Sequence, residues 1–203
     1  YVFSPAPIVS VGIKGQSERF PVRRIYCVGR NYAEHAREMG HDPERELPFF
    51  FIKHPDNLVL NNADFPYPSQ TKDVHHEIEL VVAIGKGGNN ISLDQAREHV
   101  YGYALGLDMT RRDLQGVAKK TGRPWEVGKA FEHSAPMTDI VPVSDVGQLD
   151  NGAIWLKVNG EVRQNSDLSQ LIWNIPEIIV HLSSVFELKP GDLIMTGTPA
   201  GVA

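Results

Sequence analysis

The stretch that most constrains the fold begins with charged residues and ends in a continuous apolar run. Residues 75–84 read HHEIELVVAI. Side chains on a strand alternate between its two faces, so His75, Glu77 and Glu79 would point the same way. The apolar half indicates a strand that is covered on both faces. We therefore expect a strand over 77–84 that places two carboxylates at the edge of a hydrophobic core.

Two neighbouring carboxylates repel each other, and each raises the pKa of the other. A hard divalent cation removes this repulsion, and oxygen ligands favour Mg²⁺, Mn²⁺ or Ca²⁺ over zinc. Asp108 follows a second apolar strand, expected at 101–107, and is a natural third ligand. The alternative is a solvated strand face, with Asp108 capping the next turn. The spacing of these residues alone leaves both interpretations open.

The composition limits the partners that the chain can bind. Its 203 residues favour a single domain. The 20 Lys and Arg residues against 25 Asp and Glu residues give a net charge of −5, which argues against nucleic acid or an anionic membrane as a partner. A single cysteine, Cys27, excludes an internal disulfide. With no membrane-length apolar run and no signal-peptide pattern at the start, we expect a soluble, cytoplasmic protein.

Including the two strands at 77–84 and 101–107, the expected strands outnumber the expected helices. Segments rich in Val, Ile, Tyr and Phe predict further strands at 24–28, 49–52 and 154–158. Asn159 and Gly160 then predict a type I′ hairpin turn. Helices are expected at 32–39, at 92–99, from 110 toward 120, and after an Asn174 cap. Because strands and helices do not alternate regularly, the pattern predicts a β-rich α+β fold.

The short helix expected at 32–39 carries a candidate general base. His35 and Glu38 are three residues apart, so they are adjacent on one helix face. A neighbouring carboxylate orients the imidazole and raises its pKa, which suits the deprotonation of water near neutral pH. The charged segment at 40–46 is expected to form a mobile lid. The alternative is an exposed amphipathic turn whose ion pairs matter little for stability.

Five stretches, spread over almost the whole chain, carry a family resemblance. They are IYCVGRNY at 25–32, FFIK at 50–53, HEIEL at 76–80, GYALGLDMT at 102–110 and MTGTPAGV at 195–202. In this order they resemble the fumarylacetoacetate hydrolase superfamily. The segments at 20–26 and 82–88 are most similar to the branch of that superfamily that cleaves acylpyruvates, with fumarylpyruvate as the expected substrate.

The resemblance implies a fold, an assembly and a set of site residues. The fold is a rolled mixed β-sheet with peripheral helices, here expected as a catalytic domain at 23–203 with an N-terminal extension at 1–22 packed on its core. A homodimer is implied, with one Mg²⁺ or Mn²⁺ in each subunit. The implied metal ligands are Glu77, Glu79 and Asp108, and the implied catalytic residues are His35, Glu38 and Lys129. The positions that match substrate-binding residues are Arg30, Lys53, Arg112, Gln115 and Thr198.

The expected reaction is metal-dependent hydrolysis of a carbon–carbon bond, as in the conversion of fumarylpyruvate to fumarate and pyruvate during aromatic degradation. His35 would deprotonate water, the hydroxide would attack the 4-keto carbon, and Lys129 would donate to the developing oxyanion. The cation would hold the 2-keto acid and stabilise the leaving enolate. Arg30 or Arg112 is the expected partner of the distal carboxylate.

Other functions use the same residues. An oxaloacetate decarboxylase would need the same cation and lysine but no attacking water. A keto–enol isomerase would use His35 for proton transfer, and a catalytically silent binding protein would keep only the metal site. The presence of both His35 and Glu38 favours the hydrolase, because water activation requires a base.

Overall fold

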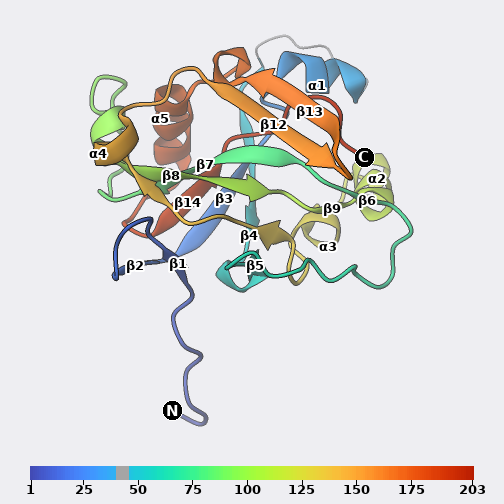
Figure 1. The fold of residues 1–203 in the computed structure, drawn as a ribbon, viewed down its shortest axis with the longest axis horizontal. Helices are drawn as coiled ribbons and strands as arrows, with labels where there is room; N and C mark the ends of the chain where they lie inside the picture. The colour runs from blue at the N-terminus through green and yellow to red at the C-terminus, as the bar shows by residue number, and fades with distance from the viewer. Residues whose placement is uncertain (40–45) are drawn as a thin grey trace.

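A mixed sheet of six strands forms the centre of the computed structural model, which describes residues 1–39 and 46–203 (Figure 1). In spatial order its strands are β11 (Val141–Pro142), β8 (Val100–Leu107), β7 (Ile78–Ile84), β14 (Asp192–Met195), β3 (Arg24–Gly29) and β4 (Phe49–Lys53). Strand β14 pairs parallel with β3, and the other pairings in this sheet are antiparallel. The sheet is therefore mixed, as expected, and it stays open because β11 and β4 do not pair.

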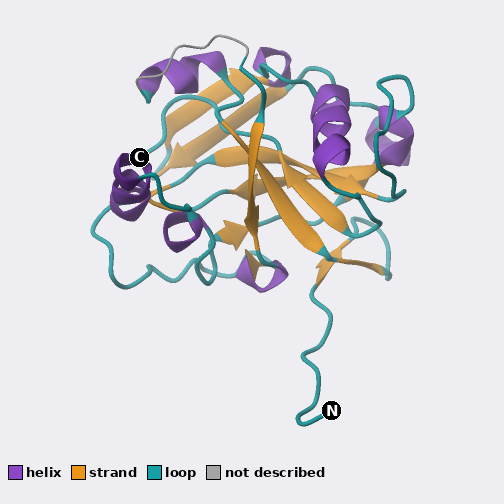
Figure 2. Ribbon diagram, turned by 180° about the vertical axis from the view of Figure 1, so that it is seen from behind, coloured by secondary structure: helices purple, strands orange, loops and turns teal. Residues whose placement is uncertain are grey.

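Smaller two-stranded pairs surround the central sheet. They are β1 (Ser10–Gly12) with β2 (Arg19–Pro21), β5 (Leu58–Val59) with β10 (Ala135–Pro136), β6 (Val74–His75) with β9 (Thr110–Arg111), and β12 (Ala153–Val158) with β13 (Glu161–Asp167). The helices of the described residues lie around these strands (Figure 2). The α-helices are α1 (Ala33–Glu38), α2 (Arg112–Thr121), α3 (Glu126–Lys129), α4 (Val143–Val146) and α5 (Ile175–Val185), and the 3₁₀ turns are Pro55–Asn57, Ala96–His99 and Leu168–Gln170.

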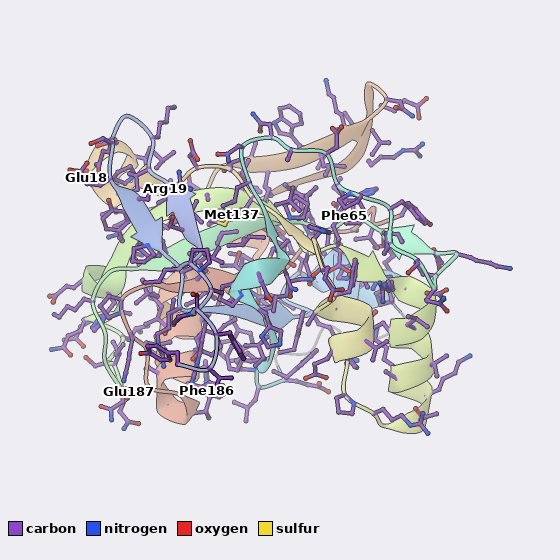
Figure 3. The ribbon with its side chains drawn as sticks, turned by 90° about the horizontal axis from the view of Figure 1, so that it is seen from below. Glu18, Arg19, Phe65, Met137, Phe186 and Glu187 are labelled. Carbon is purple, nitrogen blue, oxygen red and sulfur yellow. The ribbon has the colours of Figure 1, made fainter. Side chains whose placement is uncertain are left out.

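Strand β7 is buried along its whole length, as its apolar run predicted. Leu80 and Val82 belong to one hydrophobic cluster, which includes the buried isoleucines and Leu182 of α5. Val81 belongs to a second cluster, with residues of β1, β2 and β14. Figure 3 views the molecule from below, with Met137 of this second cluster near the centre. Glu79 has the same strand parity as Val81, so its side chain leaves the sheet on the side of the second cluster.

The five predicted strands are confirmed, each to within one residue at either end. The hairpin turn between β12 and β13 is also confirmed. Asn159 has a φ of 52° and Gly160 a φ of 84°, and these positive angles are those of a type I′ turn. The helix expected from Thr110 begins two residues later, at Arg112, because Thr110 pairs with His75 in a short ladder.

The helix predicted over 92–99 is wrong. Only a 3₁₀ turn forms there, at Ala96–His99. The Ser92 hydroxyl donates to the side-chain Oε1 of Gln95 at 3.1 Å. In a capping box the hydroxyl oxygen would instead accept from the backbone N–H of that residue. The backbone N–H of Gln95 donates to the Ser92 carbonyl at 3.1 Å, which closes a turn before a helix can start.

Helix α5 begins with the cap that the sequence predicted. Oδ1 of Asn174 accepts from the Glu177 backbone N–H at 3.1 Å, and Oε2 of Glu177 accepts from the Asn174 N–H at 3.0 Å. This reciprocal capping box satisfies two donors that a helix start otherwise leaves open. The helix packs Ile178, Ile179 and Leu182 into the first hydrophobic cluster. Its apolar face thereby covers the sheet on the side opposite to the Glu79 side chain.

Only part of the first 22 residues packs into the core. Val11, Phe20 and Val22 are buried in the second hydrophobic cluster together with Ile25. Residues 1–8 are exposed and extend away from the rest of the chain (Figures 1 and 2). The division of the chain after residue 22 stays a prediction. Among the described residues, none of the helices is long and apolar enough to cross a bilayer.

The capping box predicts a stability effect. Asn174→Ala removes the acceptor for the Glu177 N–H and should lower the free energy of unfolding by about 1 kcal/mol. Denaturant unfolding monitored by circular dichroism measures it. Ser184→Ala is the matched control at the other end of the same helix, since the exposed Ser184 hydroxyl donates only to the His181 carbonyl. Equal losses in the two variants would contradict the assigned role of the cap.

Candidate active site

Three carboxylates converge where β7 begins and β8 ends. Glu77 directly precedes β7, Glu79 lies on it, and Asp108 directly follows β8. The two strands are antiparallel, and the Asp108 N–H donates to the Glu77 carbonyl at 2.9 Å, so these strand ends are held side by side. One oxygen of each carboxylate lies within 4.8 Å of the other two. All three side chains are buried, with 4%, 2% and 1% of each residue exposed.

The ammonium of Lys129, at the end of α3, lies among these carboxylates. Its Nζ donates to Glu77 at 2.8 Å, to Asp108 at 2.6 Å and to the Thr110 hydroxyl at 2.7 Å. Burial alone would lower the pKa of Lys129, but the negative charges of Asp108 and Glu77 raise it above its ordinary value. Lys129 is therefore a charged donor at neutral pH.

The two glutamates of the site differ in their electrostatics. Burial raises the pKa of Glu79 well above its ordinary value, and the charges of Asp108 and Glu77 raise it further. For Glu77 burial acts in the same direction, but Lys129 and Arg112 outweigh it and lower the pKa. Among the described residues, a single donor bonds Glu79, the Gly197 N–H at 2.8 Å.

This donor set fits a hard divalent cation. The three ligand atoms are carboxylate oxygens, which Mg²⁺ and Mn²⁺ prefer. A cation would also offset the repulsion that burial intensifies at Glu79. The chain supplies no cationic side chain to Glu79 within its described residues, although it supplies Lys129 to both Glu77 and Asp108. Glu77, Glu79 and Asp108 are the residues that would hold the ion.

His35 and Glu38 form the pair that the helix spacing predicted. Nδ1 of His35 lies 3.2 Å from Oε2 of Glu38, and both Glu38 oxygens accept from the Gly201 N–H at 3.2 Å. The direction expected for the His35 pKa was wrong. Glu38 and Glu77 do act to raise it, but burial of the ring outweighs them and lowers the pKa. The ring is thus neutral at pH 7, and with Nδ1–H donating to Glu38, Nε2 is the acceptor.

One cavity connects His35 with the carboxylate centre. Its lining includes four of the five predicted substrate-binding residues, namely Arg30, Arg112, Gln115 and Thr198. The cavity volume is about 30 Å³, which is room for an ion or about one water molecule. An acylpyruvate therefore needs side chains of the lining to rotate outward. The lid expected over 40–46 lies outside the described residues, apart from Glu46.

Lys53, the fifth predicted substrate-binding residue, does not line this cavity. Its Nζ lies 2.8 Å from Oδ1 of Asp108, in an ion pair without hydrogen-bond alignment. It also donates to the carbonyls of Met109, at 3.3 Å, and Lys129. Lys53 therefore supports a metal-ligand candidate from behind, and it fixes the loop that follows the ligand.

Arg112 lines the cavity, but its guanidinium is already bound. It donates to Glu77 at 2.5 Å, to Oε1 of Gln115 at 2.8 Å and to Nδ1 of His75 at 3.2 Å. Thr198 donates to the Ile78 carbonyl at 2.8 Å. Both side chains orient the start of β7 as well as facing the cavity.

Several site residues escaped the sequence analysis. Thr110 and Gly197 lie within the quoted motifs GYALGLDMT and MTGTPAGV, but nothing local shows that they bond Lys129 and Glu79. Gln164, on β13, donates to Thr198 and accepts from the Ile78 N–H. A lone glutamine in a hairpin carries no signal of such a role. Lys119, which lines the cavity, was also missed.

A buried set of oxygen ligands next to a neutral, carboxylate-oriented histidine characterises a metal-dependent enzyme. The comparisons with known proteins identify which group of such enzymes this is. The family model described as "Fumarylacetoacetate (FAA) hydrolase C-terminal" matches residues 24–203, and the chain belongs to this family.

Two relatives and one crystal structure are similar to this chain over most of its length. Fumarylpyruvate hydrolase from Ralstonia sp is 52% identical over 161 residues, covering 79% of this chain and 83% of that protein. Mitochondrial oxaloacetate decarboxylase from Dictyostelium discoideum is 41% identical over 181 residues, covering 89% and 83%. The crystal structure of fumarylpyruvate hydrolase from Pseudomonas aeruginosa in complex with Mn²⁺ and pyruvate is 58% identical, with a TM-score of 0.98 over 100% of this chain and 89% of that one.

The carboxylate centre predicts metal-dependent stability. Mn²⁺ or Mg²⁺ at a hundred times its Kd should stabilise the wild type by about 2.7 kcal/mol, which for a chain of this size raises Tm by about 5–10 °C over an EDTA-treated sample. Differential scanning fluorimetry measures the shift. Glu79→Gln should abolish this shift, because a neutral amide replaces one of the three carboxylate ligands. The charge of that carboxylate is the one with which no cationic side chain of the described residues pairs.

The matched control for this test is Glu98→Gln. Glu98 is exposed and pairs with Lys86 at 3.0 Å, away from the centre. This variant should keep the full metal-dependent rise in Tm. A rise of the same size in Glu79→Gln would place the ion elsewhere.

Proposed function

We propose that this chain is a metal-dependent hydrolase that cleaves the carbon–carbon bond of an acylpyruvate, converting fumarylpyruvate and water to fumarate and pyruvate. The observation that carries the proposal is that His35, which is paired with Glu38, lines the same cavity as Glu77, Glu79 and Asp108. The 52% and 58% identity to proteins named fumarylpyruvate hydrolase supports the choice of substrate.

The residues of the cavity suit the steps of this reaction. Nε2 of His35 removes a proton from water, and Glu38 stabilises the imidazolium that forms. The hydroxide attacks the C4 carbonyl carbon of the substrate. The positive charge of Lys129, which three hydrogen bonds hold in place, stabilises the negative charge that develops on the C4 oxygen. A Mg²⁺ or Mn²⁺ held by the three carboxylates would act as a Lewis acid toward the 2-keto acid end.

Bond cleavage then follows from the same groups. The C3–C4 bond breaks, its electron pair goes to the pyruvate part, and C4 becomes the carboxyl carbon of fumarate. The imidazolium of His35 returns the proton to C3, so the base is regenerated. Each turnover thereby consumes one water molecule and needs no other reactant.

Decarboxylation of oxaloacetate is the second candidate function. It is favoured by the 41% identity to a protein named oxaloacetate decarboxylase. When CO₂ leaves oxaloacetate, the electron pair of the broken bond stays with the pyruvate part, so the same cation and Lys129 suit this reaction. They also suit a keto–enol isomerase. Decarboxylation requires no attacking water, however. The His35–Glu38 pair would then have no water to deprotonate. The pair therefore favours the hydrolase.

A variant of the base tests this distinction. His35→Ala should lower kcat/KM for fumarylpyruvate by at least about 100-fold, since general base catalysis contributes about 10²–10⁴. Loss of substrate absorbance and release of pyruvate measure it, and CO₂ release from oxaloacetate is measured alongside. His133→Ala controls for loss of an imidazole outside the cavity. Unchanged fumarylpyruvate cleavage in His35→Ala would refute the assignment of the base.

The proposal includes a role in aromatic degradation and a homodimer, which the family resemblance implies, and the cytoplasmic location expected from the sequence. Two apolar hollows, of about 360 and 430 Å³, flank β8 and share Leu105 and Thr138 in their linings. Leu105 is 43% exposed between them. A large apolar residue between two apolar hollows is typical of a surface covered by another protein chain, and a second copy of this chain is the partner we propose.

The hollows predict the effect of a charge on assembly. Leu105→Glu should shift the chain from dimer to monomer in size-exclusion chromatography with light scattering, because a buried unpaired carboxylate opposes association. Leu93→Glu is the control, since Leu93 is 58% exposed and lies outside both hollows. A monomeric wild type, or a dimer that tolerates Glu at position 105, would rule out this interface.

A further inference from the structure

A row of alternating cations and aromatic rings borders the active-site cavity. The guanidinium carbon of Arg30 lies 5.5 Å from the Phe49 ring centroid. The Phe49 and Trp125 rings meet edge to face, with centroids 5.1 Å apart and an interplanar angle of 87°. Nζ of Lys119 lies 5.1 Å from the Trp125 centroid. We refer to Arg30, Phe49, Trp125 and Lys119 as the cation–aromatic row, of which Arg30, Trp125 and Lys119 line the cavity.

The two cations of the row differ from the other cations of the site. Lys129 pairs with Glu77 and Asp108, Lys53 with Asp108, and Arg112 with Glu77. Within the described part of the chain, neither Arg30 nor Lys119 forms an ion pair. Nε of Arg30 is buried and has no hydrogen-bond partner there. Two positive charges thus border the cavity without a carboxylate to neutralise them.

The backbone at Arg30 suggests that its side chain is needed where it lies. Its φ is 57°, in the left-handed region that glycine and asparagine occupy most readily. An arginine held there costs about 1 kcal/mol or more, and such strain is characteristic of functional positions. The strained residue directs a partly buried guanidinium to the cavity.

Lys119 experiences the same excess of positive charge. Burial lowers its pKa to about 8, and the charges of Arg112 and Arg30 add to the effect. The side chain still carries a charge at pH 7, but the charged form is disfavoured by its surroundings. An anion bound beside it would relieve this repulsion.

We propose that Lys119 and Arg30 bind a second carboxylate of the substrate, at its acyl end, and so select dianionic acylpyruvates over those with a neutral acyl group. The inference rests on the proposed hydrolase function. Arg112, the other arginine expected to hold the distal carboxylate, already pairs its charge with Glu77 and also donates to Gln115 and His75, so it is less suited to bind a further carboxylate than the unpaired Arg30 and Lys119. Lys119 takes that role in the same cavity as the carboxylate centre, where the 2-keto acid end would lie.

The test compares two substrates in one variant. Lys119→Met keeps most of the side-chain length and removes the charge, so kcat/KM for fumarylpyruvate should fall about 10- to 100-fold, mainly through KM. For acetylpyruvate, whose acyl end is neutral, kcat/KM should change by less than about 2-fold. Lys119→Arg should restore most of the activity on fumarylpyruvate. Lys120→Met, at an exposed neighbouring position, should leave both substrates unaffected.

Binding of the product fumarate gives a readout that does not depend on turnover. Isothermal titration calorimetry should show that Lys119→Met weakens fumarate binding about 10-fold or more and leaves pyruvate binding unchanged. Equal losses for both substrates or both products, or no loss for either, would overturn the inference. A wild type that cleaves neither acylpyruvate yet binds fumarate through Lys119 would instead refute the proposed hydrolase function.

Discussion

The structure depends on keeping three carboxylates together in a place that water hardly reaches. Burying a charged carboxylate costs several kcal/mol unless cations or hydrogen bonds compensate it. Lys129 donates to Glu77 and Asp108, and Arg112 donates to Glu77. Glu79 receives one backbone N–H in the described part of the chain. The cost of burying a negative charge is therefore least compensated at Glu79. A divalent cation would contribute most to stability at this residue.

The scaffold holds this centre with contacts from distant parts of the sequence. Oε1 of Gln164 accepts from the Ile78 N–H at 2.9 Å, which anchors the β12–β13 hairpin to the start of β7. Gly197 donates its N–H to a carboxylate of the centre with a φ of 101°. A Cβ at this glycine would lie 2.7 Å from that of Asn31, so a larger residue would push the donor away. Hairpin and glycine motif together limit how far the carboxylates can separate.

Sequence periodicity predicted those parts of the molecule that neighbouring residues determine. The alternation around Glu77 and Glu79 located β7 and two ligand candidates, and helical spacing located the His35–Glu38 pair. Periodicity does not report contacts between distant segments. Lys129 was predicted only through the family resemblance. Lys119 was not predicted at all, because its place in the cavity lining arises from how α2 packs. The burial that lowers the His35 pKa is likewise a property of the assembled fold.

The charges of the site divide into two groups with different consequences. Glu77, Glu79 and Asp108 carry as many negative charges as Lys53, Lys129 and Arg112 carry positive ones, so these six side chains balance when all are charged. A divalent cation together with Arg30 and Lys119 then leaves the cavity positive. A substrate with one carboxylate would offset only part of this excess, whereas a dianion offsets more of it at two separate points. Because Arg30 and Lys119 supply part of this excess, the charge balance of the cavity and the position of the cation–aromatic row favour the same class of substrate.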